Sequence, residues 1–179
     1  TSAADATGGA APPKTPAAPS RSPRRAIFLG DVTLGERARC LEREPRLRAL
    51  IEPVNNVWDA KALAALLARD GPDAPPPVFV SLHKRCLAPE AHSPAEAFRL
   101  SPLLEAGARV VAQRSHPRDE AFYDGAAVTF APLSALANAV AAELAAPDSL
   151  ADATKRAAAF RRAFDVGDAF RRFGLIRDR

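Results

Sequence analysis

The chain has 179 residues, of which 47% are hydrophobic and 26% are charged, and it carries a formal net charge of +4. This length fits one ordinary domain with a real core, and two domains would be cramped. No apolar run approaches the roughly 20 residues that cross a bilayer, and the first residues hold no hydrophobic segment of the signal-peptide kind. We therefore predict a globular protein without a membrane span.

The basic residues are concentrated at the two ends of the chain. Residues 1–25 carry four basic and one acidic side chain, residues 155–179 carry eight and three, and the central part carries 13 and 17. Because the central part is acidic, we expect no basic groove for a phosphate backbone and predict no nucleic-acid partner. The terminal arginines are interpreted as solvated surface.

The two cysteines, Cys40 and Cys86, lie far apart, without a CxxC pattern or a histidine pair at zinc spacing. This pattern predicts neither a disulfide framework nor a zinc site. It favours a reducing, cytoplasmic compartment.

Residues 1–24 consist mainly of Ala, Pro, Ser, Thr and Gly, a composition that cannot bury enough apolar surface to offset its ordering entropy. We predict a disordered arm at 1–24 and a single domain at 25–179. An organelle-targeting role of the arm is the alternative, since it carries serines and arginines with a single acid. The chain begins at Thr1 and contains no methionine, which suggests a fragment or a processed product.

The predicted elements begin at residue 26. The apolar run 26–29 ends at Gly30 and has the form of a buried strand followed by a turn. Polar helical sequence continues to about Glu44, and residues 50–54 predict a second strand, weakened by Pro53. Residues 58–68 place their apolar side chains on one helical face and are followed by an Asp-Gly-Pro turn, which predicts a helix.

Residues 78–82 form a β-branched and aromatic run after a proline-rich loop and are the clearest strand. Ser93 and Glu96 predict a capping box at the start of the next helix, and Gly107 predicts its end. Further strands are predicted at 108–112 and 126–130. The apolar stripe of the following helix consists of Leu133, Leu136, Val140 and Leu144. The apolar anchors of a final helical stretch are Phe160, Phe164, Phe170 and Phe173.

Alternating strands and helices of these lengths predict an α/β fold: a Rossmann-like, mainly parallel sheet with helices on both faces, and C-terminal helices that pack back on the domain. Ligands of such sheets bind beyond the carboxyl ends of the strands. The residues predicted to lie there are Gly30, Asp31, Thr33, His83, Lys84, Arg114 and Ser115.

Two segments at this edge are candidates for contacts with phosphate. The loop from Gly30 to Gly35 could offer amides at a helix N-terminus, but it is neither a GxGxxG sequence nor a P-loop, so an ordinary tight turn is the alternative. His83 and Lys84 follow the clearest strand directly, where a histidine suits a diphosphate or a reacting sugar hydroxyl. The alternative for them is an exposed turn.

Two glutamates flank the predicted helix before Gly107. The capping box alone accounts for Glu96. Glu105 opposes the helix macrodipole, so either simple exposure or a ligand explains it. The sequence contains no G-x-S-x-G elbow and no DxD pair, which argues against a serine hydrolase and against a metal-dependent transferase. We predict a site without a metal ion or cofactor.

Residues 96–111, Glu-Ala-Phe-Arg-Leu-Ser-Pro-Leu-Leu-Glu-Ala-Gly-Ala-Arg-Val-Val, resemble the donor-site helix and following strand of GT-B glycosyltransferases. The whole of 25–179 is similar in order to the C-terminal, donor-binding half of that family. The closest resemblance is to glycosyltransferase-like bacterial and algal proteins. This sequence differs from the family pattern in two ways. Eight residues separate Glu96 from Glu105 where the family usually has seven, and the acceptor-binding half is absent.

The resemblance implies a metal-independent glycosyl transfer from a nucleotide-sugar donor. It implies Glu105 as the ribose ligand and His83 or Lys84 as phosphate contacts. We predict His83 as the catalytic residue. The predicted donor-binding residues are Gly30, Lys84, Glu96, Arg99 and Glu105. An N-terminal domain or a partner chain is expected to complete the site. The alternative function is a non-catalytic Rossmann-like module that binds a nucleotide or a protein.

Overall fold

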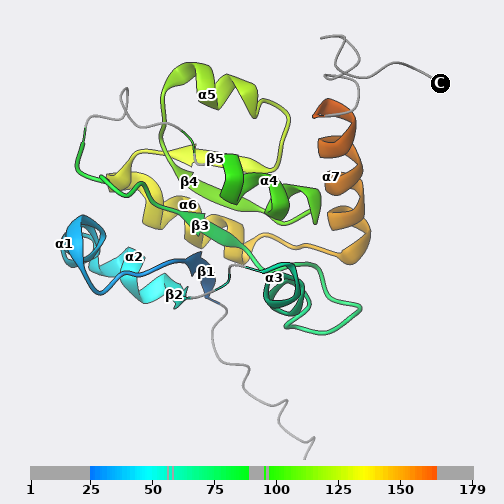
Figure 1. Cartoon of the computed structure of the whole chain (residues 1–179), viewed down its shortest axis with the longest axis horizontal. Coiled ribbons are helices and arrows are strands. Elements are labelled where there is room, and N and C mark those ends of the chain that lie inside the picture. The colour runs from blue at the N-terminus through cyan, green and yellow to red at the C-terminus, as the bar shows by residue number, and fades with distance from the viewer. Residues whose placement is uncertain (1–24, 56, 58, 89–94, 96, 165–179) are drawn as a thin grey trace, which may run out of the picture.

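The structure is a computed structural model that describes residues 25–55, 57, 59–88, 95 and 97–164. These residues form one five-stranded, all-parallel sheet in the order β2-β1-β3-β4-β5, with helices around it (Figure 1). The α/β Rossmann-like fold predicted from the sequence is confirmed. The strands are β1 (Ala26–Leu29), β2 (Ile51–Val54), β3 (Phe79–Ser81), β4 (Val110–Gln113) and β5 (Val128–Ala131). The helices are α1 (Gly35–Arg43), α2 (Pro45–Leu50), α3 (Ala60–Leu67), α4 (Ala97–Glu105), α5 (Pro117–Phe122), α6 (Leu133–Ala145) and α7 (Leu150–Ala163).

Strand β1 lies inside the sheet and pairs on both sides. Ile27 is opposite Glu52 of β2 on one side and opposite Phe79 of β3 on the other. All three residues of β1 from Ala26 to Phe28 are buried, as expected of a short apolar strand covered on both faces. Pro53 fits in β2 because this strand is at the edge of the sheet, where a missing amide breaks no further ladder.

The alternation of side chains along the strands gives the sheet two apolar faces. On one face Phe28 and Val80 pack with residues of α1, α2 and α6, among them Leu41 and Leu136. On the other face Ile27, Phe79 and Val110 pack with α4 and with partly buried leucines of α3. The domain therefore has three layers, with the sheet in the middle (Figure 1).

Helix α7 packs back on the domain against α4, as the sequence predicted for the C-terminal helix (Figure 1). Phe160 is buried in the same core cluster as Leu100 of α4. Gly107 ends the α4 segment with a φ of 79°, and a side chain there would collide with the backbone of Ala153. The close approach of α7 to this turn requires glycine at position 107.

Two helices were not predicted, namely α2 and α5, which have six residues each. Both start with a proline at the first helical position, and His116 caps α5 by accepting a hydrogen bond from the amide of Arg118. Helices this short show no repeated apolar stripe, so periodicity does not reveal them. The predicted arm at 1–24, the capping box of Ser93 and Glu96, and the anchors Phe170 and Phe173 lie outside the described residues.

The structure contains a disulfide bond between Cys40 and Cys86, so the prediction that the cysteines form no disulfide is wrong. They are 46 residues apart in sequence, but the pairing of β1 with β3 brings the end of α1 next to the turn that follows β3. Their Cα atoms lie 6.5 Å apart, within the range that a disulfide spans. The argument for a reducing, cytoplasmic compartment therefore loses its basis, and the compartment stays a prediction.

Within the described part of the chain, the helices are too short and too polar to cross a lipid bilayer.

Candidate functional site

The strand order places a topological switch point at the carboxyl ends of β1 and β3. From β1 the chain turns to β2 on one side, and after β2 it crosses to β3 on the other side. In open parallel sheets the crevice for a ligand lies at this point, because the connecting loops diverge there. Gly30 leaves β1 at this position with a φ of 139°, and its amide donates a 3.0 Å hydrogen bond to the carbonyl of Val54.

The loop after Gly30 is closed by its own side chains. The carboxylate of Asp31 accepts hydrogen bonds from the amide of Thr33 at 2.7 Å and from its hydroxyl at 2.6 Å. These hydrogen bonds, that of the hydroxyl above all, lower the pKa of Asp31 below its usual value. The loop therefore presents a negative charge beside Gly30, so a phosphate is favoured on the β3 side of the switch point rather than in this loop.

Arg37 of α1 also lies at the switch point, and it was not predicted from the sequence. Its guanidinium lies over the ring of Phe28, 5.3 Å from the centroid, and its Nη2 donates to the carbonyl of Leu82 at 2.9 Å. Its Nε lies 3.3 Å from the carbonyl of His83. The signal was present, because position 37 is three and four residues before the buried Cys40 and Leu41 and so shares their helical face.

His83 is buried at the end of β3, with 7% of its surface exposed. Its amide donates to Oε1 of Gln113 at 3.3 Å, and Nε2 of Gln113 donates to the carbonyl of Cys86 at 2.8 Å. The glutamine thus links the ends of β3 and β4 with the turn that carries the disulfide. This network holds the backbone on which the predicted phosphate contact Lys84 stands.

The ring of His83 faces the end of β4. Its Nε2 lies 2.9 Å from the carbonyl oxygen of Arg114 and 3.3 Å from Oγ of the buried Ser115. A carbonyl only accepts, so Nε2 carries the proton in this arrangement and cannot take one from Ser115. The pair is therefore not arranged as a nucleophile and its base.

The exposed basic side chains of the carboxyl edge follow β3 and β4. Lys84 and Arg85 are exposed in the turn after β3. Arg114 is exposed after β4, where its Nη1 lies 3.6 Å from Oε2 of the half-buried Glu120. These positive side chains lie on the β3 side of the switch point. An anion is favoured there because it is away from the negative charge of Asp31.

A pocket of about 510 Å³ lies at the opposite, amino edge, and another of about 360 Å³ opens beside Gly30. The smaller one suits a small molecule, since ligand pockets start at roughly 300 Å³. It lies between the ends of β1 and β2, the start of α3 and one side of α4. Its lining residues are Leu29, Gly30, Val54, Val57, Asp59, Ala60, Leu63, Arg99, Pro102 and Leu103.

The structure brings some of the predicted donor-binding residues together and separates others. Gly30 and Arg99 line the same pocket, and Lys84 lies at the same edge of the sheet. Glu105 is exposed at the end of α4, which leads into the start of β4, so it lies at the amino edge. Glu96 lies outside the described residues.

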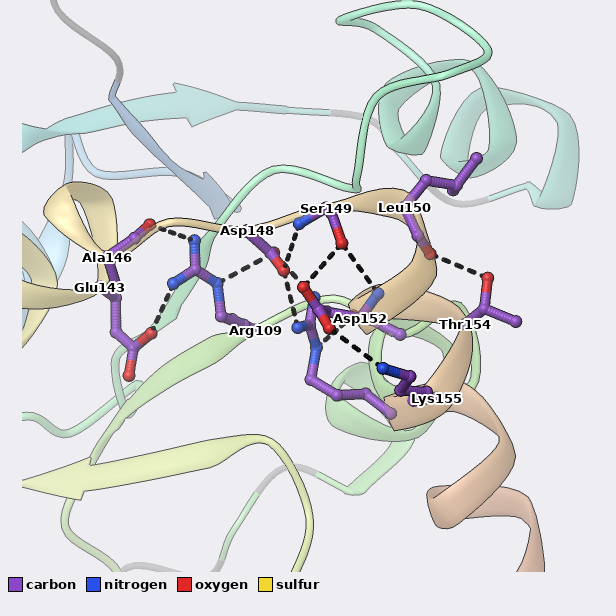
Figure 2. A network of polar contacts seen from close by, with 11 residues as sticks. Arg109, Glu143, Ala146, Asp148, Ser149, Leu150, Asp152, Thr154 and Lys155 are labelled. Atoms are coloured by element: carbon purple, nitrogen blue, oxygen red, sulfur yellow. Dashed lines mark hydrogen bonds and ion pairs between the residues drawn. The ribbon is translucent and has the colours of Figure 1, made fainter.

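The amino edge holds the larger pocket and a network of ion pairs (Figure 2). Both carboxylate oxygens of Asp148 accept 2.8 Å hydrogen bonds from Arg156, and Nε of Arg109 forms a 3.2 Å ion pair with Oδ2. Arg109 also donates to Oε2 of Glu143 at 3.1 Å. The side chain of Asp148 is only 4% exposed. Because these charged side chains form ion pairs with each other, this pocket is a poorer candidate for a charged ligand.

Within the described residues, no group of three His, Cys, Asp or Glu side chains is arranged to hold a metal ion. Comparisons of the chain with protein-family models, with curated proteins and with solved structures find no match.

Proposed function

We propose that this chain is the donor-binding domain of a GT-B type glycosyltransferase and binds the nucleoside diphosphate of a nucleotide sugar at the carboxyl edge of its sheet. The observation that carries the proposal is the 360 Å³ pocket beside Gly30 at the switch point of a parallel sheet. Nucleotides bind at this place in open α/β sheets. The resemblance of residues 96–111 to a donor-site helix gives the class of nucleotide.

The charges at this edge support a diphosphate on the β3 side. Lys84 and Arg85 supply positive charge there, and Asp31 disfavours an anion in the first loop. Cations that hold the diphosphate also stabilise it as a leaving group, which is how transfer proceeds without a metal ion. Most of the described basic side chains at the amino edge form ion pairs. Lys84 is exposed at the carboxyl edge, so removing its side chain is the best test of the proposal.

The contacts of His83 support a role in positioning. The hydrogen bond from its Nε2 to the carbonyl of Arg114 fixes the orientation of the ring at the end of β3. A catalytic role for His83 stays a prediction, and so does the acceptor domain or partner chain that would complete the cleft. The alternative, a non-catalytic nucleotide-binding module, shares the same pocket and differs only in lacking transfer.

The test is a thermal-shift and calorimetric screen of the full chain against UDP, GDP, CDP and ADP, each with its sugar conjugates. Binding to the native state raises the melting temperature by mass action. We expect one base to give a clear shift, and we expect Lys84→Ala to weaken that binding about tenfold through loss of a charged contact.

Lys155→Ala is the matched control, since Lys155 is 79% exposed on α7 and stands far along the chain from the switch point. Equal affinity of the two variants would overturn the placement of the diphosphate. No shift with any of the nucleotides, from a folded sample, would overturn the proposed function.

A further inference from the structure

The pocket beside Gly30 is lined mainly by apolar residues and by two charged side chains, Asp59 and Arg99. Most of its wall is aliphatic, with Leu29 and Val54 from the strand ends, Leu63 from α3 and Leu103 from α4. Such a wall suits a flat, weakly hydrated ring better than a phosphate or a sugar, because burying it removes apolar surface from water. The part of a nucleotide that fits this wall is the base.

Asp59 supplies a carboxylate at the rim of the same pocket. As the N-cap of α3 it accepts a 2.7 Å hydrogen bond from the amide of Ala62 through Oδ1. Within the described part of the chain no second hydrogen bond of this carboxylate is recorded, which leaves Oδ2 to accept one from a ligand. An acid that follows the second strand is the usual partner of ribose hydroxyls in nucleotide-binding α/β sheets.

Glu105, the residue that the resemblance implies as the ribose ligand, is at the wrong edge for this pocket. Helix α4 runs away from the carboxyl edge, so its last residue lies beside the start of β4. Gly107, two residues later, is bonded through its carbonyl to Arg156 of the amino-edge network. A ligand at the switch point is therefore served by Asp59 and not by Glu105.

We infer that the pocket between β1, β2, α3 and α4 takes the nucleoside of a nucleoside diphosphate, with the base against Leu63 and Leu103 and the ribose hydroxyls on Asp59. This inference rests on the proposed function and adds the subsite and the ribose ligand. The diphosphate then passes Gly30 towards Lys84. Gly30 lies on this path, because it lines the pocket at the end of β1.

The experiment measures the affinity of the full chain for UDP, GDP, CDP and ADP and for their 2′-deoxy counterparts in four variants. Ala60→Trp fills the mouth of the pocket, and Ala64→Trp puts the same side chain one turn further along α3, where it does not line the pocket; both alanines are exposed. Asp59→Asn keeps an N-cap of equal quality and removes the charge. Glu105→Gln tests the residue at the other edge.

We expect Ala60→Trp to weaken nucleoside diphosphate binding at least about tenfold and Ala64→Trp to leave it unchanged. Asp59→Asn should weaken ribonucleotides by about tenfold, as for loss of a hydrogen bond to a charged group, and should weaken the 2′-deoxy forms less. Glu105→Gln should bind as the unaltered chain does.

Two results overturn the inference while leaving the proposed function standing. One is nucleotide binding that is equal in the Ala60→Trp and Ala64→Trp variants, and the other is binding that is lost in Glu105→Gln and kept in Asp59→Asn. If the unaltered chain binds none of the nucleotides, both the inference and the proposed function fail. Circular dichroism of each variant establishes that it is folded.

Discussion

The two edges of the sheet are held together by different chemistry. At the amino edge, Asp148 pairs with the guanidinium groups of Arg109 and Arg156. Glu143, which pairs with Arg109, supplies the second negative charge (Figure 2). At the carboxyl edge, a disulfide between Cys40 and Cys86 fastens α1 to the turn after β3. Lys84 and Arg85 in that turn stay exposed.

This difference explains why the larger pocket is not the better candidate site. Charged groups that satisfy each other hold the fold, and a ligand would have to break their contacts. At the carboxyl edge, the disulfide and hydrogen bonds from Arg37 and to Glu36 hold the turn after β3. Lys84 and Arg85 are exposed in that turn, where a ligand can reach them. Substitutions at either edge can therefore test this difference.

Removing the disulfide should have the largest effect on stability. Closing a loop of 46 residues restricts the unfolded chain, and the chain-entropy relation gives about 4 kcal/mol for that length. We expect the Cys40→Ala, Cys86→Ala double variant to lose about this much free energy of unfolding, measured by urea titration.

Dithiothreitol provides the matched condition. It should lower the stability of the unaltered chain and leave that of the double variant unchanged. Alkylation by iodoacetamide followed by mass spectrometry should find both thiols protected before reduction. Two alkylated cysteines in the folded, unreduced protein would show that this edge is not covalently tied, and the comparison of the edges would fail.

Asp148→Ala tests the ion pairs of the amino edge. It leaves Arg109 and Arg156, whose side chains are only 15% and 22% exposed, without their shared carboxylate. Breaking a largely buried ion pair from one side costs about 3 kcal/mol at the lower end of the usual range. Asp73→Ala, in an exposed loop, is the control and should change the free energy of unfolding little. Equal stabilities of the two variants would mean that the network of Figure 2 contributes nothing to folding.

Gly107→Ala tests how closely α7 is held at the amino edge. Gly107 and Gly125 have similar φ angles, 79° and 76°, so alanine at either position is strained by about 1 kcal/mol. A Cβ on Gly107 would also lie 2.7 Å from the carbonyl carbon of Ala153, whereas a Cβ on Gly125 meets nothing within 4 Å. We expect Gly107→Ala to cost about 2 kcal/mol more than Gly125→Ala in urea unfolding. No difference would indicate that α7 shifts aside easily.

Much of the fold could be predicted from the sequence because it depends on local patterns. The apolar run of β1, the β-branched run of β3 and the stripe of α6 each show the period of their element. Gly107 was recognised as a helix end for the same reason. The disulfide could not be predicted, because it depends on which strands are neighbours, and spacing along the chain does not contain that information.

The candidate site was predicted less completely than the fold. Strand ends were enough to place Gly30, His83 and Lys84 at one edge, since parallel strands end together. The direction of α4 places Glu105 at the amino edge, away from the pocket beside Gly30, although the sequence had placed that residue correctly at the end of its helix. The sequence places Arg37 on the buried face of α1, but its hydrogen bond to the carbonyl of Leu82, just after β3 and 45 residues away, could not be predicted from local patterns.

Ser149→Ala should have the smallest effect, at the outer end of the amino-edge network. The hydroxyl of Ser149 caps α7 by accepting from the amide of Asp152 at 3.1 Å, and it donates to the carboxylate of Asp152 at 2.6 Å. Loss of the cap should cost about 1 kcal/mol in urea unfolding. The hydrogen bond from Ser149, followed by the charge of Lys155, holds the pKa of Asp152 below its usual value, so this carboxylate stabilises the fold at neutral pH and loses that contribution as the pH falls through its folded-state pKa. An NMR titration of Ser149→Ala should therefore find the pKa of Asp152 raised, and an unchanged pKa would mean that the hydroxyl does not contact this carboxylate in solution.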